Sequence, residues 1–271
     1  MTARFWELER LDDRVLCAFR CVDATTRTAV DAPLRIRSIA PPHPRLRSNS
    51  RGLLVVTEWA PLGQHNRTFA APPAEPAAES LPLALVVEDP QGRYLPRLVR
   101  VSLPRIADPD VAATSGSLFS PIEVPMYAAA AAAVEANWAV VRVSVRCGSD
   151  EALGGALLRV SRNGTVLATG LSDWRGEALV AIAGVPIISF SDNQNTALTS
   201  DLDVVLEGIF DPGTGTRTPL AQVRDGPPPS VLPLVDPEAL ASAGDQVPRQ
   251  QRTLRIAARR QITTTLQIDI P

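Results

Sequence analysis

The amino-acid sequence predicts an all-β fold built from two tandem β-sandwich domains, and three observations lead to that prediction. The chain has 271 residues, among them 25 Pro and 16 Gly, and so many residues that interrupt regular structure favour short strands over long helices. Apolar and polar residues alternate in several segments, as they do in half-buried antiparallel strands. Similar short segments also recur in the same order in both halves of the chain, which indicates an internal duplication.

The alternation is clearest in one segment of each half. Every second residue from Val15 to Cys21 is apolar, and the same holds from Val141 to Val145. One face of each strand is therefore expected to enter a core while the other face meets solvent. Turn signals separate such segments at intervals of roughly ten residues. They are Arg51-Gly52, Asp89-Pro90, Asn163-Gly164, Arg175-Gly176 and Pro212-Gly213.

The duplication consists of six matched pairs of segments. They are Phe19–Cys21 with Val145–Cys147, Ala32–Ile36 with Ala156–Val160, Ser48–Gly52 with Ser172–Gly176, Leu53–Val56 with Ala178–Ile182, Asp89-Pro90 with Asp211-Pro212, and Val99–Pro104 with Leu266–Pro271. We infer a first domain over residues 1–104, a linker over residues 105–138 and a second domain over residues 139–271. An insertion at about residues 213–252 is the largest departure from the repeat, and such insertions form loops in which binding sites often lie.

Two helices are expected outside the strands. Six consecutive Ala follow Pro125 closely and predict a helix from Met126 to Trp138 in the linker, because Ala has the highest helix propensity. The segment Asp236-Pro237-Glu238 begins a second, short helix, since Asp is a good N-cap and Pro is favoured at the first helical position.

The charged residues exclude several classes of function. The chain carries 27 basic and 29 acidic residues for a formal net charge of −2, and all 27 basic residues are Arg. Without Lys there is no Schiff-base chemistry, no phosphate-loop lysine and no Ser-Lys catalytic pair. The near-neutral balance argues against a nucleic-acid or anionic-membrane binder, which normally has a strong basic excess.

The sequence predicts a soluble protein of a reducing, cytoplasmic compartment. The first residues include acidic side chains at positions 7, 9, 12 and 13, where a signal peptide has an apolar run. No apolar stretch approaches the length of a membrane span. The three Cys form no disulfide framework, since Cys17 and Cys21 lie too far apart along one strand to bridge each other. We therefore expect buried free thiols.

No pattern typical of a catalytic or metal site is present in the sequence. There is no Gly-x-Ser-x-Gly elbow, and His43 and His65 have no paired zinc-ligand spacing with each other or with the Cys residues. Three strand carboxylates could form a glycosidase pair, but carboxylates on sandwich strands mostly face solvent. They are Glu58, Glu88 and Glu207. We expect no enzyme activity, no cofactor and no bound metal.

Two further sets of residues have both a functional and an ordinary interpretation. One acidic set offers oxygen ligands for Ca²⁺ but lacks the spacing of a calcium loop, so a polar loop is the favoured interpretation. It comprises Asp192, Asn193, Asn195, Asp201 and Asp203. The Trp residues could stack on sugar rings if exposed, but a place in the core is favoured. They are Trp6, Trp59, Trp138 and Trp174.

Arginine-rich segments are the candidate sites of partner contact. An expected hairpin in the first half presents its guanidinium groups on one strand face, where they would match carboxylates of an acidic partner surface. Its residues are Arg27, Arg35, Arg37, Arg45, Arg47 and Arg51, and all but Arg27 are candidate partner contacts. Nucleic acid is disfavoured because no aromatic residues are interleaved, and the alternative is a solvated face that prevents edge-to-edge aggregation. A second basic stretch has the same two interpretations, and it comprises Arg249, Arg252, Arg255, Arg259 and Arg260.

One segment of the second half resembles a known family. Leu153–Val160, Asn163-Gly164-Thr165, Gly170–Gly176 and Gly184-Val185-Pro186 together resemble a carboxypeptidase regulatory-like, or transthyretin-like, repeat. In the first half, Asn49 and Ser50 stand where that family has Asp. The resemblance implies a seven-stranded Ig-like sandwich without catalytic residues, used as an accessory or interaction module.

A second resemblance concerns the chain's role. Asp89–Arg97, followed by Leu103-Pro104-Arg105, resembles segments of proteins encoded with contractile injection systems, the phage-tail-like particles of bacteria. This implies a structural accessory subunit, with other subunits as partners and a particle released from the cell as a possible destination. We thus expect a non-catalytic structural or adaptor subunit, and the alternative is a carbohydrate- or ligand-binding accessory module.

Overall fold

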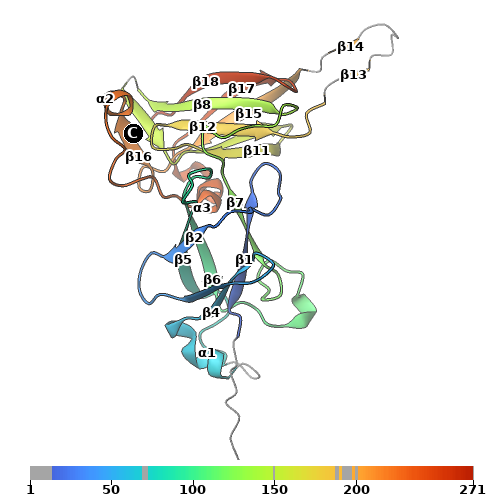
Figure 1. Ribbon diagram of the computed structural model, residues 1–271, viewed down its shortest axis with the longest axis vertical. Coiled ribbons are helices and arrows are strands. Elements are labelled where there is room, and N and C mark those ends of the chain that lie inside the picture. Colours follow the sequence, from blue (N-terminus) through green and yellow to red (C-terminus); the bar gives the residue numbers. More distant parts are fainter. Residues whose placement is uncertain are drawn as a thin grey trace, which may run out of the picture. The chain divides into compact units, whose positions relative to one another are not determined.

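A computed structural model describes residues 14–68, 73–148, 150–186, 189–190, 197–198 and 201–270 (Figure 1). The residues that the structure describes are 44% strand and 11% helix, so the predicted all-β sandwich fold is confirmed. It divides into two compact units. One comprises residues 1–20, 40–83 and 101–123, and the other comprises residues 21–39, 84–100 and 124–271.

The C-terminal repeat lies wholly in the second unit and contains two sheets. Their strands are β8 (Ala139–Cys147), β9 (Glu151–Gly154), β10 (Leu157–Arg162), β11 (Thr165–Leu171), β12 (Glu177–Ile182), β15 (Leu202–Ile209), β16 (Thr216–Pro219), β17 (Arg249–Ile256) and β18 (Gln261–Gln267). One sheet has the order β11-β10-β15-β17 and the other β12-β8-β9-β16. Strand β18 pairs with β8 in parallel, whereas the neighbours within each order pair antiparallel.

The core of this repeat is filled by alternate residues of both sheets, as the sequence pattern predicts. The inaccessible side chains include Val141, Val143, Val145, Leu158, Val160, Val180, Leu206 and Phe210. Burial of each such side chain contributes about 1.5–3 kcal/mol relative to exposure. The residues between them, such as Arg142 and Ser144, are only half-buried, so the two faces of β8 differ as expected.

The N-terminal half also contains two sheets, and their strand orders partly match those of the second half. Its strands are β1 (Cys17–Asp23), β2 (Arg35–Ser38), β3 (Arg45–Ser48), β4 (Leu54–Glu58), β5 (Leu81–Glu88), β6 (Arg97–Leu103) and β7 (Ile122–Met126). One sheet has the order β3-β4-β1-β7 and the other the order β2-β5-β6. The order β4-β1-β7 corresponds to β12-β8-β18, and β2-β5-β6 corresponds to β10-β15-β17. The third strand differs, since β3 pairs with β4 whereas β11 pairs with β10.

The strand orders correct two sequence-based interpretations. Strand β7 falls in the segment expected to be linker, yet it lies beside β1 as β18 lies beside β8. The first repeat therefore extends to Met126. The match of Val99–Pro104 with Leu266–Pro271 is also wrong, because the counterpart of β6 is β17 and the counterpart of β18 is β7. Strict alternation makes any two half-buried strands look alike in sequence.

The helix expected from Met126 to Trp138 is absent, because the backbone there pairs with the turn between β5 and β6. Ala128 forms a β-bridge with Tyr94, the Ala129 N–H donates to the Arg93 carbonyl at 2.8 Å, and the Tyr127 carbonyl accepts from Leu95 at 2.8 Å. Helix propensity is a weak preference that such tertiary hydrogen bonds override.

The second expected helix is confirmed. Helix α3 (Pro237–Ser242) has Asp236 as its N-cap, whose side chain accepts a hydrogen bond from the Ala239 N–H at 3.1 Å. The other helices are α1 (Gly63–Arg67), α2 (Leu220–Asp225) and the 3-10 turns Ala60–Leu62, Pro109–Val111 and Gly244–Gln246. Two short strands, β13 (Ser189–Phe190) and β14 (Ala197–Leu198), pair with each other. Within the described residues no helix is long and apolar enough to cross a membrane.

A second apolar cluster of the same unit joins α3 to the sheet β11-β10-β15-β17. Its buried members are Tyr127, Leu157, Leu171, Ile209, Val235 and Leu240. Val235 is fully buried, and its carbonyl accepts a hydrogen bond from the Leu98 N–H at 2.8 Å. The buried Val235, which we call the Val235 anchor, fixes the end of the preceding segment, residues 230–234.

Candidate protein-binding groove

The second unit has an open groove of about 600 Å³, and all of its lining residues belong to that unit. Three segments distant in sequence form it: strand β2, the turn from β5 into β6, and the irregular segment 230–234. The lining residues are Arg35, Arg37, Glu88, Asp89, Pro90, Gly92, Tyr94, Leu95, Pro96, Ser230, Val231, Leu232, Pro233 and Leu234.

Strand β2 places two Arg side chains along one wall of the groove. It is an edge strand, and its register with β5 puts Arg35 opposite Glu88. Arg37 donates from Nη2 to Glu88 Oε1 at 2.9 Å, so its charge is neutralised within the chain. Arg35 lies on the same exposed face and makes no ion pair within the described part of the chain. The groove therefore has one guanidinium group available to a partner.

The turn from β5 into β6 is held rigid by the Asp89 carboxylate. Asp89 is 8% exposed and accepts hydrogen bonds from the backbone N–H groups of Gln91 and Arg93, both at 3.0 Å. Gly92 follows at φ +68°, a conformation that favours Gly. Burial alone would raise the pKa of Asp89, but the hydrogen bonds from Gln91 and Arg93 and the Arg93 guanidinium outweigh it and lower the pKa. Asp89 is therefore a charged turn cap whose acceptor atoms are occupied.

Tyr94 connects this turn to the end of β1. Its hydroxyl donates to Asp23 Oδ2 at 3.0 Å. Burial of the phenol, together with the nearby Asp23 charge, raises the pKa of Tyr94 to about 12. The ring is thereby fixed as part of the groove wall and is not poised for proton transfer at neutral pH.

The opposite wall is apolar and unusually exposed. Val231 is 71% exposed and Leu232 is 45% exposed, and only Ser230 separates them from a Pro run at residues 227–229. The next residue, Pro233, is buried, and the segment ends at the Val235 anchor. The Pro residues restrict the backbone and so reduce its freedom to fold these side chains away. Isolated exposed apolar side chains are common, but a neighbouring pair on a groove wall suits a binding site.

A small apolar pocket of about 50 Å³ adjoins the groove and shares four residues with it. It is lined by Leu95, Pro96, Leu171, Ser172, Asp173, Trp174, Leu232 and Pro233. Trp174 is half-buried there. The groove thus has a cationic end at Arg35 and an apolar end beside Trp174.

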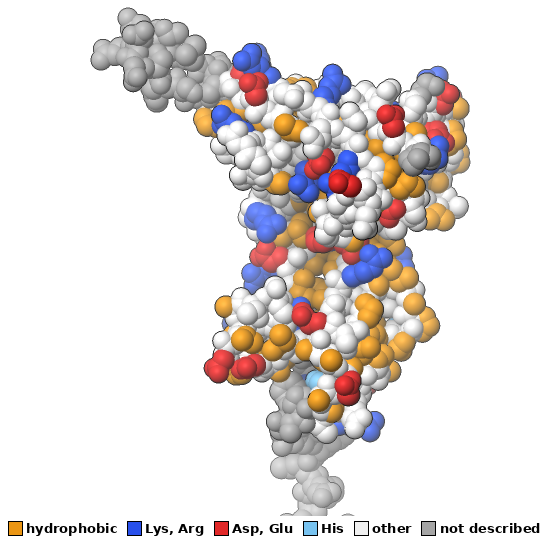
Figure 2. All heavy atoms as spheres, turned by 180° about the vertical axis from the view of Figure 1, so that it is seen from behind, with side chains coloured by type: hydrophobic (Ala, Val, Ile, Leu, Met, Phe, Trp, Pro, Cys, Tyr) orange, Lys and Arg blue, Asp and Glu red, His pale blue; other side chains and the backbone are white. Residues whose placement is uncertain are grey.

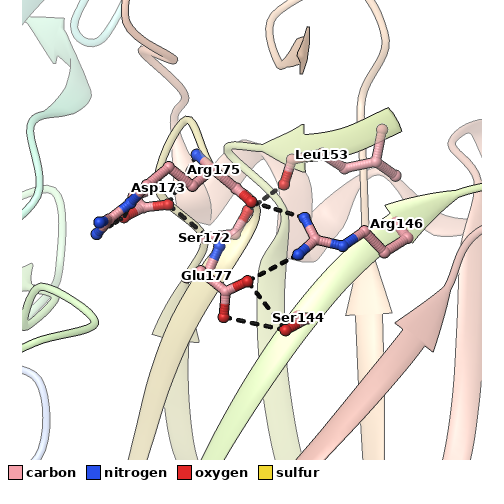
Figure 3. A network of polar contacts seen from close by, with 7 residues as sticks. All are labelled: Ser144, Arg146, Leu153, Ser172, Asp173, Arg175 and Glu177. Carbon is pink, nitrogen blue, oxygen red and sulfur yellow. Dashed lines mark hydrogen bonds and ion pairs between the residues drawn. The ribbon is translucent and has the colours of Figure 1, made fainter. Parts of the chain in front are cut away.

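The turn that carries Trp174 is fixed by a polar network, shown in Figure 3. Arg146 donates from Nη1 to the Arg175 carbonyl at 2.7 Å and from Nη2 to Glu177 Oε1 at 2.8 Å. Ser172 Oγ donates to the Leu153 carbonyl at 2.7 Å and accepts from the Ala156 N–H at 2.8 Å. Every member has a partner, so we interpret the network as a support of the pocket.

The structure separates the Arg residues that were expected to form one hairpin. Strands β2 and β3 belong to different sheets, so Arg35 and Arg37 are on β2 while Arg45 and Arg47 are exposed on β3 in the first unit. Arg45 faces Glu58 at 3.8 Å, and Arg51 lies in the turn after β3. The hairpin was wrong because the Pro41-Pro42 segment between the strands is not a tight turn.

Arg255 of the second predicted Arg stretch is paired with acidic residues of its own unit. Arg255 lies 3.7 Å from Asp201 and 3.6 Å from Asp203, measured from Nε to the carboxylate oxygens. Arg259 is exposed in the turn before β18 with φ +61°. Asp192, Asn193 and Asn195, the rest of the candidate Ca²⁺ set, lie outside the described residues. Arginine and acidic side chains are also intermingled on the face seen in Figure 2.

The carboxylates considered for catalysis are all engaged by Arg. Glu58 faces Arg45, Glu88 pairs with Arg37, and Glu207 lies 3.4 Å from Arg159 and 3.5 Å from Arg249. Within the described residues no group of His, Cys, Asp or Glu side chains could hold a metal ion.

The three thiols are free, and burial raises the pKa of two of them. Cys17 is buried, and burial raises its pKa to about 12, with Arg105 opposing the shift. Cys21 is half-buried, and burial raises its pKa to about 11, with Arg97 opposing it. Cys147 is also half-buried. The expectation of buried free thiols therefore holds fully for Cys17 and in part for the other two.

Comparison with known proteins assigns no family. No family model matches the sequence, and no curated protein matches it. Among solved structures, the chain is similar to the Bacillus anthracis TIE protein, with 8% sequence identity and a TM-score of 0.26. The alignment covers 94% of this chain and 34% of that chain, so this chain spans about a third of that protein's length. A likeness of this degree carries no inference about function.

Proposed function

We propose that the chain is a non-catalytic structural or adaptor subunit that binds other proteins, and that the assembly it joins is a phage-tail-like contractile injection particle. The first part rests on the groove, where Arg35 is exposed and has no ion pair with any described residue, and where Val231 and Leu232 form an exposed apolar wall. A cationic end next to exposed apolar side chains suits contact with protein, since interfaces combine apolar cores with charged rims.

The assignment to a particle rests on the sequence resemblance of Asp89–Arg97. Residues of that same segment, from Asp89 to Pro96, line the groove. The carboxypeptidase regulatory-like assignment is likewise a proposal. Its support is the set of seven strands, β1–β7, whose order is largely repeated in the second half.

A carbohydrate-binding module is the weaker candidate, because each described Trp residue is buried (Trp59) or half-buried (Trp138 and Trp174). Trp59 is 7% exposed and donates its indole N–H to the Pro42 carbonyl at 2.9 Å. Trp174 lies in a turn and is one of the residues that line the small pocket. Sugar binding by stacking needs an accessible ring face.

The test is isolation of the tagged chain from its host cells under gentle lysis, followed by protein identification and negative-stain microscopy. Recovery of tube, sheath or baseplate-like particles that carry the chain would support both parts of the proposal. Recovery with other proteins but without particles would retain the adaptor role and remove the particle. Recovery of the chain alone as a monomer would contradict the proposed function.

A further inference from the structure

We propose that the groove binds an extended segment of a partner protein in which an acidic residue lies close to a small apolar one. This inference deepens the proposed function by stating the chemistry of the partner. The acidic residue pairs with Arg35, and the apolar residue covers Val231 and Leu232 and enters the pocket beside Trp174.

The acidic residue of the partner segment is inferred from the ion pairs in the groove. Of the four charged side chains that line it, Arg37 and Glu88 neutralise each other at 2.9 Å, and Asp89 is capped by its own turn and by Arg93. Arg35 is left without an ion pair within the described residues, so the groove presents one positive charge. A carboxylate is the protein group that matches a guanidinium fork.

The apolar residue of the partner segment is inferred from the exposed apolar side chains on the groove wall. Val231 and Leu232 together form a neighbouring exposed pair, and the adjoining pocket of about 50 Å³ suits a small aliphatic group. A segment that carries both kinds of side chain would bury this pair and gain about 25 cal/mol for each Å² of apolar surface removed from water.

An extended segment is the form that the groove admits best. It is bordered by strand β2, which is the terminal strand in the order β2-β5-β6, and by residues 230–234, which have no regular structure. Short edge strands can accept a further strand. In an extended chain, residues two apart point to the same side about 6.6 Å from each other. Glu and a small aliphatic residue at such a spacing could therefore both face the groove.

The first experiment is direct binding of peptides to the full chain. The probes are fluorescein-labelled peptides with a Ser background that contain one Glu and one Val, separated by one, three or five residues. Matched probes carry Gln or Lys in place of Glu. We expect saturable binding of at least one Glu probe, measured by fluorescence polarisation, and at least threefold weaker binding of the matching Gln probe. Equal binding of the Glu, Gln and Lys probes, or binding of none, would overturn the proposal.

The variants test the two ends of the groove separately. Arg35→Glu should weaken the Glu probe by about tenfold and strengthen the Lys probe, whereas Arg162→Glu should change neither, because Arg162 is an exposed residue at the end of β10 that does not line the groove. Val231→Asp should weaken the Glu probe by a similar factor. Val231 is 71% exposed, so its replacement should leave the unfolding transition unchanged. A charge reversal at Arg35 without effect on probe preference would remove the assigned role of that residue.

Isolation of complexes from host cells distinguishes this inference from the function on which it rests. The wild-type chain is compared with a double variant that carries Arg35→Glu and Val231→Asp. If both recover the same partners in equal amount, the groove proposal fails and the adaptor role stands. If the wild-type chain recovers nothing, the proposed function fails, and the peptide data alone decide the groove. Concentration-dependent dimerisation abolished by Val231→Asp would assign the groove to a second copy and overturn the proposal.

Discussion

Asn49 and Asp173, which lie 124 residues apart, hold the same turn with the same hydrogen bonds. Asn49 Oδ1 accepts from the N–H groups of Arg51 and Leu53 at 3.0 and 2.9 Å. Asp173 Oδ1 accepts from those of Arg175 and Glu177 at 2.8 and 3.1 Å. The two copies of the repeat therefore build one turn geometry with two different side chains. An amide oxygen serves as well as a carboxylate, because the turn needs an acceptor and not a charge.

This relationship predicts unequal effects of two substitutions at Asp173. Asp173→Ala removes both side-chain acceptors from a residue that is 7% exposed, and we expect it to lower the free energy of unfolding by about 1–3 kcal/mol. Asp173→Asn retains an acceptor of the kind Asn49 uses and loses the ion pair with a half-exposed Arg175, so we expect a loss of about 1 kcal/mol or less. Urea unfolding followed by far-UV circular dichroism measures both. Equal losses for the two variants would show that the charge matters more than the acceptor.

The glycines of the two turns form a second matched pair. Gly52 has φ +70° and Gly176 has φ +74°, so an L side chain is strained at both positions. A Cβ on Gly52 would meet nothing within 4 Å, whereas a Cβ on Gly176 would lie 2.5 Å from the Val145 carbonyl oxygen. We expect Gly52→Ala to cost about 1 kcal/mol and Gly176→Ala to cost at least about twice that. Equal shifts of the unfolding midpoint would contradict the steric argument.

Much of the fold can be predicted from sequence because its determinants are local. The alternation in β1 and β8, the turn residues around Gly52 and Gly176, and the N-cap at Asp236 each act within a few residues. Local helix propensity gives a wrong prediction where tertiary hydrogen bonds determine the backbone conformation. Six Ala are held extended or in turns because Tyr94 and Arg93 pair with their backbone.

The candidate site could be predicted only in part. Arg35 and Arg37 were identified because Arg at alternate positions marks one face of a strand. Whether the charge of each Arg is neutralised depends on Glu88. The register between β2 and β5 brings Glu88 beside them from a segment about fifty residues away. The apolar wall at residues 230–234 falls in the insertion where binding was expected. A single sequence does not indicate that this apolar wall and β2 line the same groove.

The buried Arg97 provides a test of the polar interior of the second unit. Its side chain is 1% exposed, donates from Nη1 to the Pro125 carbonyl at 2.7 Å and forms an ion pair with Glu238. Arg97→Ala leaves a buried acceptor and a cavity, and we expect a loss of about 3–5 kcal/mol. Glu238 is 57% exposed, so Glu238→Gln should cost about 1 kcal/mol or less. Thermal unfolding of both variants measures the difference, and a large effect of Glu238→Gln would show that the ion pair dominates.

The thiols should be protected in the folded chain. With burial raising the pKa of Cys17 to about 12 and that of Cys21 to about 11, the thiolate fraction at pH 8 is about a thousandth or less. We expect N-ethylmaleimide to modify both residues at least ~100-fold more slowly in the native chain than in guanidinium chloride, measured by peptide mass mapping. Rapid native modification of Cys17 would mean that β1 opens far more often than its burial indicates.

Asp89 should make the turn beside the groove sensitive to acid. Hydrogen bonds from Gln91 and Arg93 lower its pKa against the opposing effect of burial, so the folded chain binds the proton less tightly than the unfolded chain does. The resulting stabilisation is fully present above the unfolded pKa of about 3.9 and is lost as the pH falls through the lower folded value. We therefore expect Asp89→Asn to be less stable than the wild type at pH 7, by about 1–2 kcal/mol for the weakened hydrogen bonds, and this difference to shrink below pH 4. Asp110→Asn, at an exposed carboxylate, is the matched control. Urea unfolding at both pH values measures the difference, and a gap between Asp89→Asn and the wild type that stays constant from pH 7 to pH 3 would show that the Asp89 charge does not contribute to the turn.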